Sequence, residues 1–314
     1  MEPKYLEILD DEIIAFIEKT EHHYPADSTN ASIAEQRQFY DDLCRAFEGP
    51  WPSNVTKTDR WITSGKAVIG VRDYKTDKPS SHAHVIYIHG GGFVVGSLES
   101  HDSICAEFCA KTGLSVTSVD YRLAPEHEHP TAYNDCLNAF RCVEAETDLP
   151  IILAGDSAGG TLAAAVANTV GGSGGTLIGQ LLIYPALGGA EHSGSRIEHA
   201  NAPMLTVADM DFYEQIRGGG RDLSLDATAT PLAADEFTHL PPTVIITAAC
   251  DPLAGDGKHY RDSIVASGGK AVWFNEAGLV HGYLRARHMS EQAKASFNRM
   301  IQALNMLSKE SWDF

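Results

Sequence analysis

The sequence has little that would suit a nucleic-acid-binding, membrane-spanning or secreted protein. Its 24 Lys and Arg residues against 42 Asp and Glu give a net charge of −18, which argues against nucleic acid or an anionic membrane as a partner. No segment approaches the ~18 uninterrupted apolar residues of a membrane span. Residues 1–19 lack a basic start followed by an apolar core, so no secretion signal is predicted. We therefore expect a cytoplasmic protein without nucleic-acid or membrane partners.

Metal-binding and disulfide patterns are also scarce. The 6 cysteines form no CxxC pair, and in a cytoplasmic protein they are most simply reduced thiols. Two histidine pairs, His82 with His84 and His127 with His129, are joined by no carboxylate or cysteine at ligand spacing. We expect these histidines at the surface and predict no metal site.

Short apolar runs separated by segments of helical character fill most of the chain. These runs are residues 85–88, 115–119, 151–154, 181–184, 243–247 and 271–274. Alternation of this kind is typical of a mostly parallel sheet with helices on both faces. Residues 60–74 add two β-like runs around Gly65, which predict an antiparallel pair. The sequence thus predicts an α/β fold with about eight strands.

Two regions depart from this alternation and predict a helical cap. Residues 4–19 have apolar side chains at helical spacing, and Ser32 with Glu35 forms a capping box that starts a second helix. The insertion after residue 187 is rich in Gly, His, Asp and Arg. The predicted division is N-terminal cap helices in 1–50, the main domain in 51–187 and 231–314, and a cap insertion in 188–230.

One pentapeptide, Gly155-Asp156-Ser157-Ala158-Gly159, lies between an apolar run and an Ala-rich segment of high helix propensity. A strand, tight turn and helix in this order favour a nucleophile elbow, in which a strained backbone exposes the serine hydroxyl. Gly155 and Gly159 are small enough for strand and helix to approach closely. The Ala158 N–H would point toward an oxyanion formed beside Ser157. An ordinary glycine turn is the alternative interpretation.

The stretch His89-Gly90-Gly91-Gly92 follows an apolar run directly. Three glycines leave backbone N–H groups uncovered and free to adopt positive φ, so with Ala158 they could supply up to three donors to one oxyanion. A phosphate cradle would need Gly-Lys-Ser/Thr or GxGxxG, and neither is present. A plain glycine turn remains the alternative.

A serine nucleophile needs a base, and the base needs an acid that fixes its tautomer. Sheets with a nucleophile elbow carry them in the order Ser, Asp or Glu, His. His281 follows the apolar run 271–274, whereas the other histidines after the elbow fall in the insertion or on predicted helices. Asp251 ends a predicted strand at its carboxyl end, where such sheets carry their sites. Asp256 is the rival, but we expect it to cap a helix that begins near Gly257.

Five motifs occur in a fixed order: HGGG at 89–92, YRLAPE at 121–126, GDSAGG at 155–160, DPL at 251–253 and HG at 281–282. Together they resemble the hormone-sensitive-lipase-like esterases of the α/β-hydrolase superfamily over about residues 80 to 290. Residues 33–37 are similar to the N-terminal region of bacterial acetyl esterases. The resemblance implies the α/β-hydrolase fold with a helical cap.

The resemblance also assigns roles. These are the nucleophile, base and acid (Ser157, His281, Asp251), the oxyanion donors (Gly91, Gly92, Ala158) and supporting residues (His89, Gly90, Asp156, Glu126). In the family the supporting histidine is structural, and the two supporting acids help hold the elbow and its neighbouring loops.

These observations predict a serine carboxylesterase that hydrolyses short-chain acyl esters through an acyl-enzyme, with a small-molecule ester as partner and no cofactor. A small-molecule receptor on the same scaffold is one alternative, but such receptors lack the catalytic histidine and this chain has His281. Cleavage of an amide or peptide bond is the other. An edge strand near the C-terminal helix would allow a homodimer.

Overall fold

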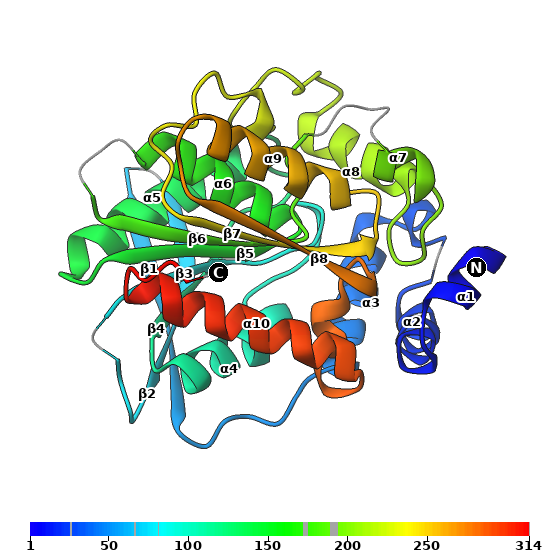
Figure 1. Cartoon of the computed structure of the whole chain (residues 1–314), viewed down its shortest axis with the longest axis horizontal. Helices are drawn as coiled ribbons and strands as arrows, with labels where there is room; N and C mark the ends of the chain where they lie inside the picture. The colour runs from blue at the N-terminus through cyan, green and yellow to red at the C-terminus, as the bar shows by residue number, and fades with distance from the viewer. Residues whose placement is uncertain (26, 66, 81, 172–174, 189–193, 314) are drawn as a thin grey trace.

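The computed structural model describes residues 1–25, 27–65, 67–80, 82–171, 175–188 and 194–313, and at its centre lies an eight-stranded sheet (Figure 1). The strands are β1 (Val55–Ser64), β2 (Ala67–Thr76), β3 (His84–Ile88), β4 (Ser115–Asp120), β5 (Ile151–Asp156), β6 (Leu177–Ile183), β7 (Thr243–Cys250) and β8 (Ala271–Val280). Their order in space is β1-β2-β4-β3-β5-β6-β7-β8. β1 pairs antiparallel with β2, and β2 with β4, while the other neighbours are parallel. The predicted mostly parallel sheet with an antiparallel pair is confirmed.

Helices cover both faces of the sheet because the central strands are apolar on both. Val85 and Tyr87 of β3 belong to one buried cluster, and Ile86 and Ile88 belong to the other, as the two-residue repeat of a strand requires. One face is covered by α4 (Asp102–Thr112) and α10 (Glu291–Ser308), and the other by α5 (Thr131–Glu146), α6 (Ala158–Val170) and α9 (Ala254–Ala266) (Figure 1). The predicted two-faced coverage is confirmed.

The N-terminal segment differs from the single helix expected over residues 4–19. It forms α1 (Pro3–Ile8) and α2 (Asp11–His23), separated at Asp10. The Asp10 carboxylate accepts a hydrogen bond from the Ile13 N–H at 2.8 Å, so it caps a new helix instead of continuing the first. The apolar spacing runs through this break, which is why periodicity alone missed it.

Two further helical regions lie near the carboxyl ends of the strands. α3 (Ile33–Ala46) starts at the predicted capping box of Ser32 and Glu35. In the described part of the insertion, α7 (Gly194–Glu198) precedes α8 (Val207–Gly218), and residues 189–193 of the predicted cap insertion lie outside the described residues. Figure 1 shows α1, α2 and α3 beside the end of the sheet, with α7 and α8 above them.

Strand β8 is longer than the predicted run 271–274 and extends to Val280. As the last of the described strands in the sheet it pairs with β7 alone, so polar residues such as Asn275 and Glu276 can face solvent. Because of these polar residues, the apolar run in the sequence ends before the strand does. The extension carries the chain to His281.

Other sequence expectations have mixed outcomes. All 6 cysteines lie in described segments and are free thiols. His84 and His129 are not surface residues: His84 is partly buried between Ser115 and Thr117, and His129 is buried against Asp226. No helix within the described residues combines the length and apolarity needed to cross a bilayer.

Candidate active site

The tight turn between β5 and α6 holds Ser157 in a strained conformation, with φ 52° and ψ −123°. Its neighbours two residues away must be glycine. A Cβ on Gly155 would lie 2.5 Å from the carbonyl oxygen of Gly159, and a Cβ on Gly159 would overlap the carbonyl oxygen of Ile88. Strand and helix therefore approach as closely as a nucleophile elbow requires, and the Ser157 side chain keeps accessible surface.

A single histidine bridges the serine to a buried carboxylate. His281 Nε2 lies 2.9 Å from Ser157 Oγ, and His281 Nδ1 lies 2.7 Å from Asp251 Oδ2. Because a carboxylate only accepts, Nδ1 donates to Asp251 and leaves Nε2 as an acceptor for the serine hydroxyl. The other Asp251 oxygen accepts from the Leu253 N–H at 2.9 Å, which fixes the carboxylate. Both side chains come directly after strands, at the ends of β7 and β8.

The glycine-rich turn after β3 lines the same cavity as Ser157. Gly91 and Gly92 have φ values of +124° and +58°, and the Gly91 carbonyl accepts from the N–H groups of Val94 and Val95 to close the turn. Among the described residues, no acceptor receives a hydrogen bond from the N–H of Gly91, Gly92 or Ala158. The predicted oxyanion donors are thus free to bind an oxygen at the Ser157 side chain.

Asp156 ties the elbow to that turn. It accepts hydrogen bonds from the Gly90 N–H at 3.0 Å and the Tyr87 hydroxyl at 2.7 Å, and His101 Nε2 lies 3.3 Å away. Burial opposes its charge, but the contacts with His101 and Tyr87 and the nearby Arg285 guanidinium outweigh that effect and lower the pKa of Asp156. An ionised Asp156 therefore keeps the elbow and the glycine turn in register.

His89 is a packing residue. Its ring stacks on Tyr121 at 4.3 Å between centroids, and its Nδ1 donates to the Gly90 carbonyl at 2.8 Å. Burial lowers the pKa of His89 to about 3, so it is neutral at physiological pH. The Tyr121 hydroxyl donates to the His89 carbonyl at 2.9 Å and fixes the start of the turn.

Glu126 lies away from the elbow and joins a loop to α3. Arg37 donates to both Glu126 oxygens at 2.9 and 2.6 Å. The same guanidinium donates to the Val94 carbonyl at 2.9 Å and the Ala124 carbonyl at 3.1 Å. Glu126 thus helps hold the N-terminal helices against the glycine turn.

Comparisons with known proteins identify the family of this chain. Residues 85–285 match a family model described as the alpha/beta hydrolase fold, which covers more than half of the chain. The chain belongs to the α/β-hydrolase family. It is 38% identical to Esterase LipI of Mycobacterium tuberculosis over 291 residues, which is 89% of this chain and 90% of that one. It is also 37% identical to Carboxylesterase NlhH of the same species, covering 70% and 72%.

Solved structures resemble the whole hydrolase. The ester-hydrolase EH1AB1 from the metagenome of Lake Arreo has a TM-score of 0.87 at 29% identity, covering 95% of this chain and 98% of that one. The thermostable carboxylesterase EstE1 from a metagenomic library has a TM-score of 0.83 at 33% identity, covering 88% and 98%. The predicted α/β-hydrolase fold and the resemblance to hormone-sensitive-lipase-like esterases are confirmed, and the chain is a carboxylic ester hydrolase.

Asp256 was expected to cap the next helix, and that prediction is wrong. It is the third residue of α9, is fully buried, and accepts from the N–H groups of Leu187 and Gly188 at 3.0 and 3.1 Å. Arg196 of α7 pairs with it at 2.9 Å. Asp256 therefore anchors the insertion to the main domain, and it is not the carboxylate that contacts His281.

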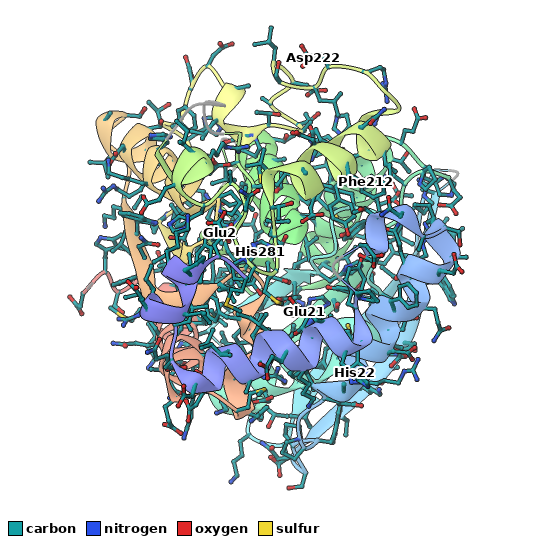
Figure 2. All side chains as sticks on the ribbon, turned by 90° about the vertical axis from the view of Figure 1, so that its right-hand side faces the viewer. Glu2, Glu21, His22, Phe212, Asp222 and His281 are labelled. Atoms are coloured by element: carbon teal, nitrogen blue, oxygen red, sulfur yellow. The ribbon has the colours of Figure 1, made fainter. Side chains whose placement is uncertain are left out.

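Two cavities meet at Ser157. One, of about 140 Å³, runs beneath α2 and α3 and is lined by residues that include Thr20, Tyr40 and Arg285. The other, of about 550 Å³, is bordered by α8 and the segment that follows it, including Arg217 and the exposed residue Asp222. Figure 2 shows α1 and α2 crossing the side of the hydrolase on which His281 lies.

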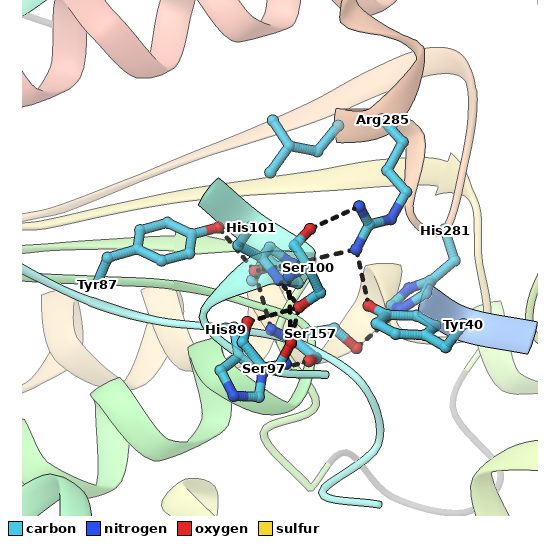
Figure 3. Close-up of polar contacts among 12 residues, drawn as sticks. Tyr40, Tyr87, His89, Ser97, Ser100, His101, Ser157, His281 and Arg285 are labelled. Atoms are coloured by element: carbon cyan, nitrogen blue, oxygen red, sulfur yellow. Dashed lines mark hydrogen bonds and ion pairs between the residues drawn. The ribbon is translucent and has the colours of Figure 1, made fainter. Parts of the chain in front are cut away.

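Sequence reasoning missed most of the residues that line the smaller cavity. Arg285 contacts both Tyr40 and His101, and all three line the cavity together with Ser157 (Figure 3). Only Arg285 carried any signal, because it lies four residues after His281. Among the described residues, no cluster of three or more His, Cys, Asp or Glu side chains is arranged to hold a metal ion.

Proposed function

We propose that this carboxylesterase hydrolyses short-chain acyl esters through a Ser157–His281–Asp251 triad and an acyl-enzyme. The observation that supports this most strongly is the position of the His281 ring, 2.9 Å from Ser157 Oγ on one side and 2.7 Å from Asp251 on the other. A serine hydroxyl becomes a nucleophile only when such a base takes its proton.

The reaction follows from these positions. His281 Nε2 accepts the Ser157 proton as Oγ bonds to the ester carbonyl carbon, and Asp251 stabilises the resulting imidazolium. The carbonyl oxygen becomes an oxyanion and accepts from the N–H groups of Gly91, Gly92 and Ala158. His281 then gives its proton to the departing alcohol oxygen, which leaves an acyl-serine. Water then attacks this ester as His281 takes its proton. The bond between Ser157 Oγ and the acyl carbon breaks, His281 returns the proton to Oγ, and the carboxylic acid leaves.

The cavity volumes support a short acyl chain. The acyl group stays bound to Ser157 after the alcohol has left, so the smaller cavity under α2 and α3 suits the acyl group and the larger one the alcohol. A protein cavity of about 150 Å³ holds a molecule of the size of benzene. A cavity of about 140 Å³ therefore fits acyl chains up to roughly hexanoyl.

We further propose that residues 1–50 and 188–230 act together as the cap. Their described parts contact each other: Tyr24 and Tyr213 share a hydrogen bond at 3.0 Å, and Asn201 donates to Glu2 at 3.1 Å. A Cβ added to Gly92 would lie 2.7 Å from the Tyr213 ring, so the ring packs directly against Gly92. The cap thus closes over the proposed oxyanion donors and sets the pocket size.

The test is a series of p-nitrophenyl esters from acetyl to dodecanoyl, assayed with the wild type and Ser157→Ala. We expect turnover to be highest for acyl chains of up to about six carbons and to vanish in the variant. Ser53→Ala, at an exposed serine, should behave as wild type. A folded wild type that turns over none of the esters would contradict the proposal and favour a receptor or a narrowly specific amidase.

The free edge of the sheet supports the expected homodimer. Strand β8 is the last strand and pairs only with β7 among the described strands. An edge strand of this kind could pair with the same strand of a second copy. Light scattering after size exclusion should give twice the monomer mass of 33.9 kDa, and a monomer mass would contradict this.

A further inference from the structure

The smaller cavity, under α2 and α3, is lined by several hydrogen-bond donors, although an alkyl chain can accept no hydrogen bond. Its apolar lining includes Leu43, Val95 and Ile104, but Arg285 and Tyr40 also line it. Polar groups in an enclosed site cost free energy unless a partner satisfies them. The hydrogen bonds that these polar groups still lack therefore indicate what the cavity binds.

Within the described part of the chain, Arg285 is a cation that forms no ion pair with a carboxylate. Its Nη1 donates to the Ser100 carbonyl at 3.0 Å, and its Nη2 donates to the Tyr40 hydroxyl at 2.9 Å and faces His101 Nε2 at 3.4 Å (Figure 3). No Asp or Glu of the described residues forms an ion pair with it. The Nε–H and one N–H of Nη1 meet no acceptor within those residues, and Arg285 keeps part of its surface accessible.

Two hydroxyls add to this set of donors. The Tyr40 oxygen accepts from Arg285, so its own proton is left for another acceptor. Burial raises the pKa of Tyr40, which keeps that proton in place. Thr20 of α2 lines the same cavity and is 6% exposed, and its hydroxyl has no hydrogen-bond partner among the described residues. An unpaired buried hydroxyl of this kind usually marks a missing ligand or water.

Among the described residues, the carboxylate that lines this cavity is already hydrogen-bonded. Asp156 is the carboxylate that lines the cavity, and its oxygens receive hydrogen bonds from Tyr87 and Gly90 and contact His101. It offsets part of the Arg285 charge at a distance but does not satisfy the free N–H groups. The donors of Arg285, Tyr40 and Thr20 thus come from three elements and share one cavity, and no carboxylate of the described residues accepts a hydrogen bond from them.

We infer that the smaller cavity binds acyl groups that carry an acceptor oxygen beyond the ester carbonyl, either a carboxylate or a neutral carbonyl. Arg285 is the specificity-determining residue, and Tyr40 and Thr20 add further hydrogen bonds. The inference rests on the proposed function, because the same Ser157 must attack the ester. Apolar walls from Leu43 and Ile104 would hold the methylene groups between the two carbonyls.

Three ethyl esters with acyl groups of equal size provide the test. Monoethyl succinate ends in a carboxylate, ethyl 4-oxopentanoate in a methyl ketone, and ethyl 4-methylpentanoate in an isopropyl group. Hydrolysis is followed in a pH-stat, because each ester releases an acid. A hydrogen bond from a charged donor is worth about 10- to 100-fold in affinity. We expect kcat/KM for at least one oxygenated ester to exceed that of the alkyl ester by about 10-fold or more.

Variants then assign the preference to Arg285. Arg285→Met should lower the ratio of oxygenated to alkyl kcat/KM toward unity, and Arg285→Lys should restore part of it for the succinate by keeping the charge. Thr20→Val, which keeps shape and removes the hydroxyl, should lower the ratio by a smaller factor. Arg141→Met removes an exposed charge elsewhere and should leave the ratio unchanged.

The outcomes separate this inference from the proposed function. If the wild type hydrolyses the alkyl ester faster than both oxygenated esters, the inference is wrong while the esterase mechanism stands. If it hydrolyses none of the three and no p-nitrophenyl ester, the proposed function fails first. Should Arg285→Met fail to fold, the wild-type ranking of the three esters still decides. Preference for the succinate identifies the carboxylate, and preference for the ketone identifies a neutral carbonyl.

Discussion

The carboxyl edge of the sheet and the smaller cavity beside it are built on different principles. At the edge, Ser157, Asp251 and His281 each follow directly after a strand, so the parallel sheet itself brings them together. In the smaller cavity, Thr20, Tyr40 and Arg285 come from α2, α3 and the turn after β8. The chemistry thus depends on local backbone geometry, whereas the pocket depends on long-range packing.

This difference explains why the residues at the edge of the sheet could be predicted from the sequence. A nucleophile elbow needs glycine at fixed positions, so the short-range spacing around Ser157 predicts its geometry. The contact of Arg285 with Tyr40 joins residues far apart in the chain, and no local pattern in the sequence predicts it. Motifs therefore predict reaction type, and substrate choice needs the folded structure.

The largest effect should come from the triad histidine. His281→Gln removes the proposed base, and we expect kcat on p-nitrophenyl butanoate to fall by about 10⁴-fold or more. The variant should unfold in urea near the wild-type midpoint. His259→Gln, at an exposed histidine of α9, is the matched control. A loss of kcat of less than about tenfold for His281→Gln would contradict the role of His281 as the base.

The next largest effect concerns stability and tests how closely strand and helix pack at the nucleophile elbow. Gly159→Ala would push a Cβ into the carbonyl oxygens of Ile88 and His89, which are backbone atoms that cannot rotate away. We expect the free energy of unfolding to fall by about 3 kcal/mol or more. Gly194→Ala, where the added Cβ meets nothing within 4 Å, should leave it nearly unchanged. Urea unfolding that shows equal losses for both variants would contradict the packing argument.

Acid should weaken the sheet through the partly buried histidine His84. Burial lowers the pKa of His84 to about 4, against about 6.5 when it is free. Between these values the unfolded chain binds more protons, so the free energy of unfolding is full above about pH 6.5 and falls as the pH drops toward 4. One histidine contributes a slope of up to about 1.4 kcal/mol per pH unit. His84→Gln should flatten the urea-derived profile in this window, and an unchanged slope would refute the assignment.

The smallest effect should come from the link between α3 and the loop after β4. Glu126 is 54% exposed, so removing its charge in Glu126→Gln should cost at most about 1 kcal/mol of unfolding free energy. Arg37→Gln should cost more, because Arg37 also donates to the carbonyls of Val94 and Ala124. Thermal melts of the two variants compare them, and an equal cost would show that the backbone contacts add nothing.

Several features of the fold could be predicted from the sequence, and others could not. Apolar runs placed the strands because a two-faced parallel sheet needs them. Asp10 broke the first helix by capping a second, since a side-chain hydrogen bond outweighed continuous apolar spacing. The polar residues of edge strand β8 hid its true length. Asp256 resembled a helix cap, yet its burial against Arg196 and two backbone N–H groups gives it an anchoring role.

Covalent trapping of the nucleophile tests the central claim most directly. Diethyl p-nitrophenyl phosphate transfers its diethylphosphoryl group to an activated serine and releases p-nitrophenolate. Peptide mass spectrometry should find one adduct per chain, on Ser157, and none on Ser157→Ala. The His281→Gln variant should react far more slowly. An adduct on another residue, or none on a folded wild type, would contradict a mechanism in which Ser157 is activated by His281.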